Sequence, residues 1–133
     1  MNPKEYMEAA DRLRRRITRK ENELLSLRAT ADGMTGMGSS DMPKTVSPDP
    51  HKMEATVCRI IMLEGEIRGI RSELEHLVSE MRTEIEQVQD GDYRDVLTKR
   101  YLEFKPWRTI AVEMFISERQ AYYIHREALS LLD

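Results

Sequence analysis

Cysteine, aromatic residues and long apolar runs are all scarce in this chain of 133 residues. The single cysteine, Cys58, excludes an internal disulfide and favours a reducing compartment, and we expect it to pack as a small apolar residue in a helix seam. Aromatic residues make up 6% of the chain, which leaves little material for an enzyme-like pocket. Because no apolar run approaches the roughly 18 residues of a membrane span and the N-terminus has no apolar signal region, we expect a cytoplasmic protein with no membrane partner.

Side chains that carry catalysis or bind metals are scattered along the chain. His51, His76 and His125 lie in different predicted elements, and none has metal-ligand spacing with Cys58 or with another histidine. The carboxylates occupy helix-surface positions near Arg and Lys, which is typical of a solvated face. There is no phosphate-binding loop and no dinucleotide fingerprint. We therefore expect no catalytic site, no metal and no cofactor, and we predict that the protein is not an enzyme.

Two long segments show the alternating four-and-three apolar spacing of a coiled coil. The first starts with an Asn2 cap and Pro3 and ends near Ala31, and the second runs from about Pro50 to Gln89. The expected seam positions are Tyr6, Ala10, Leu13, Ile17, the polar Lys20, Leu24 and Leu27, then Ile60, Leu63, Ile67, Ile70, Leu74, Leu77, Met81 and, after a break at Glu84, Val88. Each helix must bury its stripe, so we predict a long antiparallel helical hairpin.

The stretch between the two helices, residues 32–50, holds three Gly and three Pro without periodicity and is predicted to be a flexible loop. Residues 1–90 are thus expected to form a hairpin domain with a homo-oligomer contact through its coiled coil. A helix-swapped dimer would bury the same stripes.

The C-terminal region, residues 91–133, is predicted to be a trihelical head. Asp92 suits an N-cap for a helix over residues 93–104, whose inward positions would be Val96, Leu97, Tyr101 and Leu102. Pro106 can open the next helix, and Trp107 is expected to anchor the core.

The last 28 residues, PWRTIAVEMFISERQAYYIHREALSLLD, have the layout of a DNA-binding helix-turn-helix. Ile110, Ala111 and Met114 form one face of a short helix. Ser117 with Gln120 three residues later is a capping box that starts a second helix. The inward face of that helix is expected to comprise Ala121, Ile124, Ala128, Leu129 and Leu132.

Residues from about 93 to 132 resemble the C-terminal promoter-reading domain of bacterial sigma factors. The family pattern I-A-x-x-x-G-I-S-x-x-x-V is matched from Ile110-Ala111 through Ile116-Ser117 to Ala121. Phe115 stands where the family has its turn glycine, and Ala121 where it has a valine. Because a bulky residue disfavours a positive φ, we expect the turn to differ or Phe115 to fill the core.

The chain as a whole is similar to small sigma-like regulators of prophages in Gram-positive bacteria, and the runs "SPDPHKMEATV" and "SERQAYYIHREAL" carry that likeness. The resemblance implies sequence-specific binding of double-stranded DNA and phage or prophage transcription control in a bacterial host, by a dimer or together with RNA polymerase. The residues expected to contact DNA are Lys105, Arg108, Ser117, Arg119, Gln120, Tyr122, Tyr123 and Arg126. Of these, Arg119 and Gln120 suit base edges, whereas Lys105 and Arg108 suit phosphates.

Charge is distributed unevenly: residues 1–30 carry net +3, residues 31–90 net −6 and residues 91–133 net zero. A region that binds DNA alone normally carries a basic surface, so a neutral head favours a dimer or a protein held by a larger partner. Two alternatives remain open. One is a phage DNA-packaging recognition subunit with the same head on a multimeric ring, and the other is a coiled-coil interaction protein without DNA binding.

Overall fold

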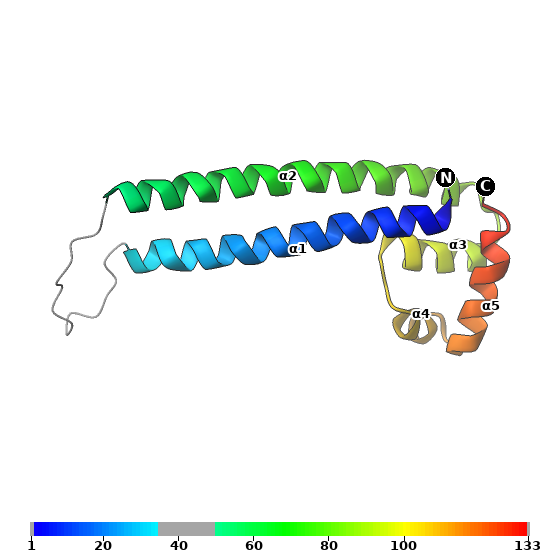
Figure 1. The fold of residues 1–133 in the computed structure, drawn as a ribbon. Coiled ribbons are helices and arrows are strands. Elements are labelled where there is room, and N and C mark those ends of the chain that lie inside the picture. Colours follow the sequence, from blue (N-terminus) through cyan, green and yellow to red (C-terminus); the bar gives the residue numbers. More distant parts are fainter. Residues whose placement is uncertain (1, 35–49, 133) are drawn as a thin grey trace. The chain divides into compact units, whose positions relative to one another are not determined.

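The protein is all-helical throughout the residues that the structure describes, as predicted. The computed structural model describes residues 2–34 and 50–132, and no strand occurs in either stretch. The elements are α1 (Pro3–Met34), α2 (Pro50–Glu86), α3 (Gly91–Leu97), the π-helical turn η1 (Thr98–Leu102), α4 (Trp107–Met114) and α5 (Glu118–Leu129) (Figure 1).

The ends of the helices follow local capping chemistry. The Asn2 side chain accepts from the backbone N–H of Lys4 at 2.8 Å, so the predicted cap of α1 is confirmed. The predicted cap at Asp92 is wrong, because the carboxylate of Asp90 accepts from the N–H groups of Asp92 and Tyr93, at 2.9 and 3.1 Å. Helix α3 therefore begins at Gly91.

The prediction of a loop over residues 32–50 is wrong at both of its ends, which are helical. Helix α1 continues past Ala31 to Met34, and α2 begins at Pro50. The remainder of that prediction, residues 35–49, lies outside the described residues.

The chain divides into two compact units. We call Met1–Arg12 with Glu73–Asp133 the head unit, and Leu13–Ser72 the helix-pair unit. Helices α1 and α2 contribute to both. The boundary predicted at residue 90 falls within the head unit, and the division into 1–90 and 91–133 stays a prediction about function.

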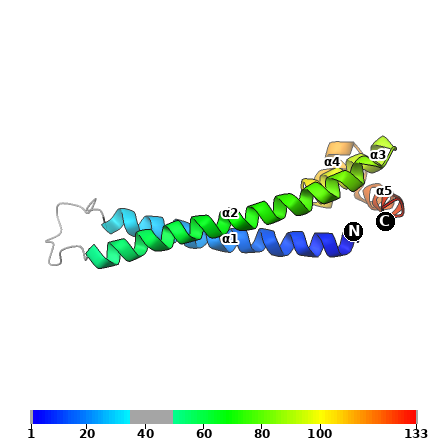
Figure 2. The ribbon, with the colours of Figure 1, turned by 90° about the horizontal axis from the view of Figure 1, so that it is seen from above.

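In the helix-pair unit, α1 and α2 lie side by side in both views (Figures 1 and 2). Ion pairs join the two helices. Arg28, which lies further along α1 than Glu21, pairs with a residue that lies earlier in α2, so the helices run antiparallel. The pairs are Glu21–Arg71 at 3.1 Å, Lys20–Glu66 at 2.9 Å, Arg28–Glu64 at 3.6 Å and Glu23–Arg59 at 2.9 Å.

The predicted apolar positions form the seam of this pair. Those that are buried are Leu13, Ile17, Leu24, Leu63, Ile67 and Ile70. The polar member, Lys20, is half-buried and donates to Glu66, whose pKa it holds below the usual value. Cys58 is exposed, so its expected place in the seam is wrong. Cys58 lies two positions before Ile60 and five positions before Leu63 in α2. At 100° per residue its side chain therefore points to the side of α2 that faces away from α1.

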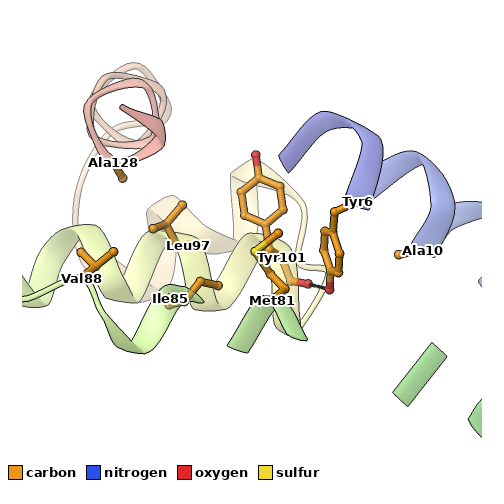
Figure 3. Packing of buried hydrophobic residues seen from close by; sticks show 8 residues of the cluster. All are labelled: Tyr6, Ala10, Met81, Ile85, Val88, Leu97, Tyr101 and Ala128. Carbon is orange, nitrogen blue, oxygen red and sulfur yellow. Dashed lines mark hydrogen bonds between the residues drawn. The ribbon is translucent and has the colours of Figure 1, made fainter. Parts of the chain in front are cut away.

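The head unit has its own core, to which distant parts of the sequence contribute (Figure 3). Its buried members are Tyr6, Ala10, Met81, Ile85, Val88, Leu97, Tyr101 and Ala128. The Tyr6 hydroxyl donates to the backbone carbonyl of Tyr101 at 2.6 Å, which ties α1 to η1 across 95 residues of sequence. Helix α5 packs against α3 and α4.

Leu63 and Leu25 give a direct test of the seam. Leu63 is 0% exposed and Leu25 is 64% exposed, and both lie in the helix-pair unit. We expect Leu63→Ala to lower the free energy of unfolding by about 2–5 kcal/mol, because it removes buried methyl groups and leaves a cavity. The same change at Leu25 should alter it by less than about 0.5 kcal/mol. Urea denaturation followed by circular dichroism measures both, and equal losses would contradict the seam.

Candidate nucleic-acid interface

Helices α4 and α5 cross one another closely. In Figure 1 α4 is seen nearly along its axis while α5 is seen from the side, and Figure 2 reverses the two views. Ile110 and Ala111 of α4 and Ala121 of α5 are buried, as predicted. The alanines have short side chains, so the two backbones can approach at the crossing.

The turn between these helices departs from both expectations for Phe115. Phe115 itself adopts the left-handed conformation, with φ 58° and ψ 39°, and it is 95% exposed rather than packed in the core. Backbone hydrogen bonds hold this conformation, because the N–H of Phe115 donates to Val112 at 3.3 Å and that of Ile116 to Ala111 at 3.0 Å. Position 115 thus adopts the left-handed conformation with a phenylalanine rather than a glycine.

The start of α5 is confirmed at Ser117. Its extended backbone precedes Glu118, and its hydroxyl accepts from the N–H of Gln120 at 3.1 Å. This is the first of the two hydrogen bonds of the expected capping box.

Four of the residues predicted to contact DNA form an outward row on α5. Arg119, Gln120, Tyr123 and Arg126 are exposed, whereas Ala121 and Ala128 on the other side are fully buried. We call these four residues the outer row of α5. A helix with one buried face and such a row can place long polar side chains on a partner surface.

The two predicted phosphate contacts have different surroundings. Arg108, in the first turn of α4, is exposed. The Nζ of Lys105 lies 2.8 Å from Glu103 and 2.7 Å from Glu113, and both hydrogen bonds raise the pKa of Lys105. Glu113 also accepts from Lys99 at 2.7 Å. A phosphate would have to compete with two carboxylates for Lys105, so Arg108 is the better placed of the two.

Tyr122 lies at the edge of an aromatic cluster that joins α4, α5 and η1. The Trp107 ring is 4.7 Å from Tyr122 and 4.6 Å from His125, with the guanidinium of Arg100 5.0 Å away over its ring. Trp107 is half-buried and packs between elements, in line with the anchor role predicted for it. Tyr122 therefore has a structural contact as well as an exposed edge.

His125 is held by a hydrogen bond that the sequence did not reveal. Its Nε2 is 2.7 Å from the hydroxyl of Tyr101, and the two rings stack at 5.6 Å. Burial, with a smaller effect of Arg100, lowers the pKa of His125 to about 4. The imidazole is therefore neutral at physiological pH. Burial also raises the pKa of Tyr101.

A cavity of about 510 Å³ opens beside this cluster. Met7 of α1, Trp107, Tyr122, His125 and Leu129 contribute to its lining. Most of these side chains are apolar or aromatic, so the cavity can receive an apolar group or a flat ring.

Sequence reasoning missed two exposed apolar side chains near the turn. Val112 is 70% exposed and Phe115 is 95% exposed. The helical spacing contained a signal for Val112, because it lies 100° from Ala111 and away from Ile110. No such signal exists for Phe115, whose direction depends on the left-handed turn.

Among residues 2–34 and 50–132, no group of three or more His, Cys, Asp or Glu residues could hold a metal ion. Within the same residues, no helix combines the length and the apolar character needed to cross a bilayer.

Comparison with protein families, with curated proteins and with solved structures yields no match to this chain.

The left-handed Phe115 predicts an unusual substitution effect. We expect Phe115→Gly to raise the free energy of unfolding by about 1 kcal/mol, because glycine adopts a positive φ without a steric penalty. Val112→Gly is the matched control, since it also removes an exposed apolar side chain but places glycine within α4. It should lower stability by about 1 kcal/mol. Thermal unfolding of both variants measures the difference, and a destabilised Phe115→Gly would contradict a left-handed turn.

The lowered pKa of His125 predicts how stability depends on pH. The unfolded chain binds a proton on this imidazole near pH 6.5 and the folded protein near pH 4, so between these values the unfolded state binds more protons. The free energy of unfolding should therefore fall by about 1–2 kcal/mol as the pH drops from 6.5 to 4. This energy is smaller than the full pKa difference would give, because the ring is partly solvated.

His125→Gln provides the control for this pH dependence. It removes the titrating group and leaves the carboxylates unchanged. The stability difference between wild type and variant should shrink steadily toward pH 4. A difference that stays constant from pH 7 to pH 4 would exclude a buried neutral His125.

Proposed function

We propose that this protein is a sequence-specific binder of double-stranded DNA that regulates transcription, of the sigma-like phage or prophage type. In this proposal α4 and α5 are a helix-turn-helix, α5 is the recognition helix, and the protein acts in the cytoplasm of a bacterial host without catalysing a reaction. The observation that carries the proposal is the exposure of the outer row of α5, in which Arg119, Tyr123 and Arg126 lie opposite the buried Ala121 and Gln120 lies on the flank.

The outer row has the chemistry that base recognition requires. A recognition helix enters the major groove with its N-terminal residues nearest the base edges. Arg119 lies in the first turn of α5 and is assigned to guanine, whose O6 and N7 accept two hydrogen bonds. Gln120 follows and is assigned to adenine. Tyr123 and Arg126, further along α5, would add base or phosphate contacts.

The phosphate contacts are assigned to the ends of the helices. Ser117 caps α5, where backbone N–H groups and the helix dipole favour an anion. Arg108 in the first turn of α4 is assigned to the neighbouring phosphate. Lys105 would join it only after releasing Glu103 or Glu113, and Tyr122 would contribute its exposed edge.

The charge balance supports binding with help from a partner. Residues 91–133 have no net charge, and Glu118 places a carboxylate beside Arg119. Phosphate attraction by the head alone is therefore weak. We infer that the protein binds DNA as a dimer or together with RNA polymerase, and that α1 and α2, as a coiled-coil hairpin, supply the assembly surface.

A coiled-coil interaction protein without DNA binding is the second candidate. The neutral head and the exposed apolar pair Val112 and Phe115 favour it, because such side chains suit a protein surface. The two candidates differ in whether the protein selects a DNA sequence.

The test is selection from random-sequence duplexes with the full chain, followed by affinity measurements on the selected motif. We expect a discrete motif, and we expect Arg119→Ala and Arg126→Ala each to weaken binding about tenfold or more through the loss of base or phosphate contacts. Arg82→Ala is the control, since Arg82 is an exposed arginine on α2 and not on α5. It should change affinity less than threefold.

Two results would count against the proposal. Equal losses for Arg82→Ala and Arg119→Ala would mean that only total charge matters. The absence of any selected motif at low salt, both alone and with RNA polymerase added, would favour the interaction protein.

A further inference from the structure

Helix α2 carries a second apolar face that α1 does not cover. Val57, Ile61 and Met62 are 42%, 61% and 57% exposed. At 100° per residue Ile61 lies opposite Leu63, Ile67 and Ile70, which are buried against α1, and Val57 and Met62 lie on the two flanks. The exposed face is therefore a separate surface of the helix-pair unit.

Two glycines continue this face, and the fold itself does not require either of them. A Cβ atom at Gly69 would meet nothing within 4 Å, and one at Gly65 would meet only the side-chain end of Arg68 at 3.7 Å. Glycine within a helix lowers its stability relative to alanine. Because Gly65 and Gly69 have no side chains, the surface of α2 is recessed at these two positions beside the protruding Ile61 and Met62. We call this recess the low strip.

We propose that this face is the contact between two copies of the protein, which pair antiparallel through α2. The face comprises Val57, Cys58, Ile61, Met62, Gly65, Gly69 and Ser72, and we call it the outer stripe of α2. A two-fold axis near Gly65 relates the copies. This inference rests on the dimer that is part of the proposed function and specifies its contact surface. It does not depend on whether the protein binds DNA.

The outer stripe is complementary to itself in this arrangement. An axis near Gly65 sets Ile61 of each copy over Gly69 of the other, so a protruding side chain meets the low strip. Cys58 of one copy is then level with Ser72 of the other. Close helix packing follows because the residue at the axis has no side chain.

Charge is complementary in the antiparallel arrangement. Arg68 and Glu64 lie along the same edge of the outer stripe, and an antiparallel two-fold axis brings this edge of each copy together. Arg68 of each chain is then about 3 Å along the axis from the level of the other chain's Glu64, a partly exposed carboxylate that also lies 3.6 Å from Arg28 of its own chain. A parallel two-fold axis would bring opposite edges together and would separate Arg68 from the partner's Glu64. The contact spans residues 57–72 of one helix, a small interface by the standard of stable dimers, so we expect a dissociation constant of the order of micromolar.

The first experiment is sedimentation of the full chain across a concentration series. Ile61→Glu should weaken dimerisation at least about tenfold, because it places a carboxylate at the centre of the contact. Leu25→Glu is the matched control: Leu25 is 64% exposed, Ile61 is 61% exposed, and both changes add one negative charge to the same unit. The control should dimerise like the wild type.

The second experiment tests register and direction by oxidation. In Ser72→Cys, Cys58 should form a disulfide with residue 72 of the other copy, which yields a covalent dimer. These positions are about 21 Å apart along one helix, so they cannot pair within a chain. Ser72→Cys combined with Cys58→Ser should remain uncrosslinked, as should the wild type.

Each opposite result overturns the inference. A wild-type dimer that survives Ile61→Glu, or that crosslinks through Cys58 alone, excludes this face or this direction while leaving a dimer by another surface. A wild type that stays monomeric at high concentration excludes both the face and the dimer. Neither result decides whether the head selects DNA, since duplex selection measures that separately.

Discussion

The need to bury a continuous apolar stripe on each of two long helices governs the rest of this structure. A helix as long as α1 or α2 does not stay folded in water with such a stripe exposed, and pairing α1 with α2 removes both stripes from solvent in Leu13–Ser72. The ion pairs along the seam add orientation more than stability, because their partners are partly exposed. The same helices supply Tyr6, Ala10, Met81 and Ile85 to the core of the head unit.

Within the head unit, small buried residues position the candidate interface. Ala111, Ala121 and Ala128 leave room for helix α5 to lie close to its neighbours, and their burial turns the outer row of α5 toward solvent. Polar groups at the edge of this core are satisfied internally, as the hydrogen bond between Tyr101 and His125 illustrates. The recognition chemistry that we propose for the outer row of α5 therefore depends on packing by other residues.

The lack of net charge in residues 91–133 and the outer stripe of α2 both favour a protein that acts as part of an assembly. Residues 91–133, with equal numbers of acidic and basic side chains, gain little from phosphate attraction. In the function that we propose, two such regions joined in one assembly, or one region held by a polymerase, would provide the affinity that a single one lacks. Val112 and Phe115 add an apolar surface beside the proposed DNA contacts.

The periodicity of the sequence was sufficient to predict the all-helical class, the seam positions and the start of α5 at Ser117, because these depend on contacts within one or two helical turns. The sequence also predicted Arg119, Gln120, Tyr123 and Arg126 as DNA contacts, and all four side chains are exposed. The tertiary structure alone decided that Lys105 is shared between two carboxylates, that His125 is neutral against Tyr101 and that Phe115 projects from a left-handed turn. The contacts of Lys105 with Glu113 and of His125 with Tyr101 form only when separate segments pack, and the direction of Phe115 follows from the backbone of the turn. A one-dimensional apolar pattern encodes neither.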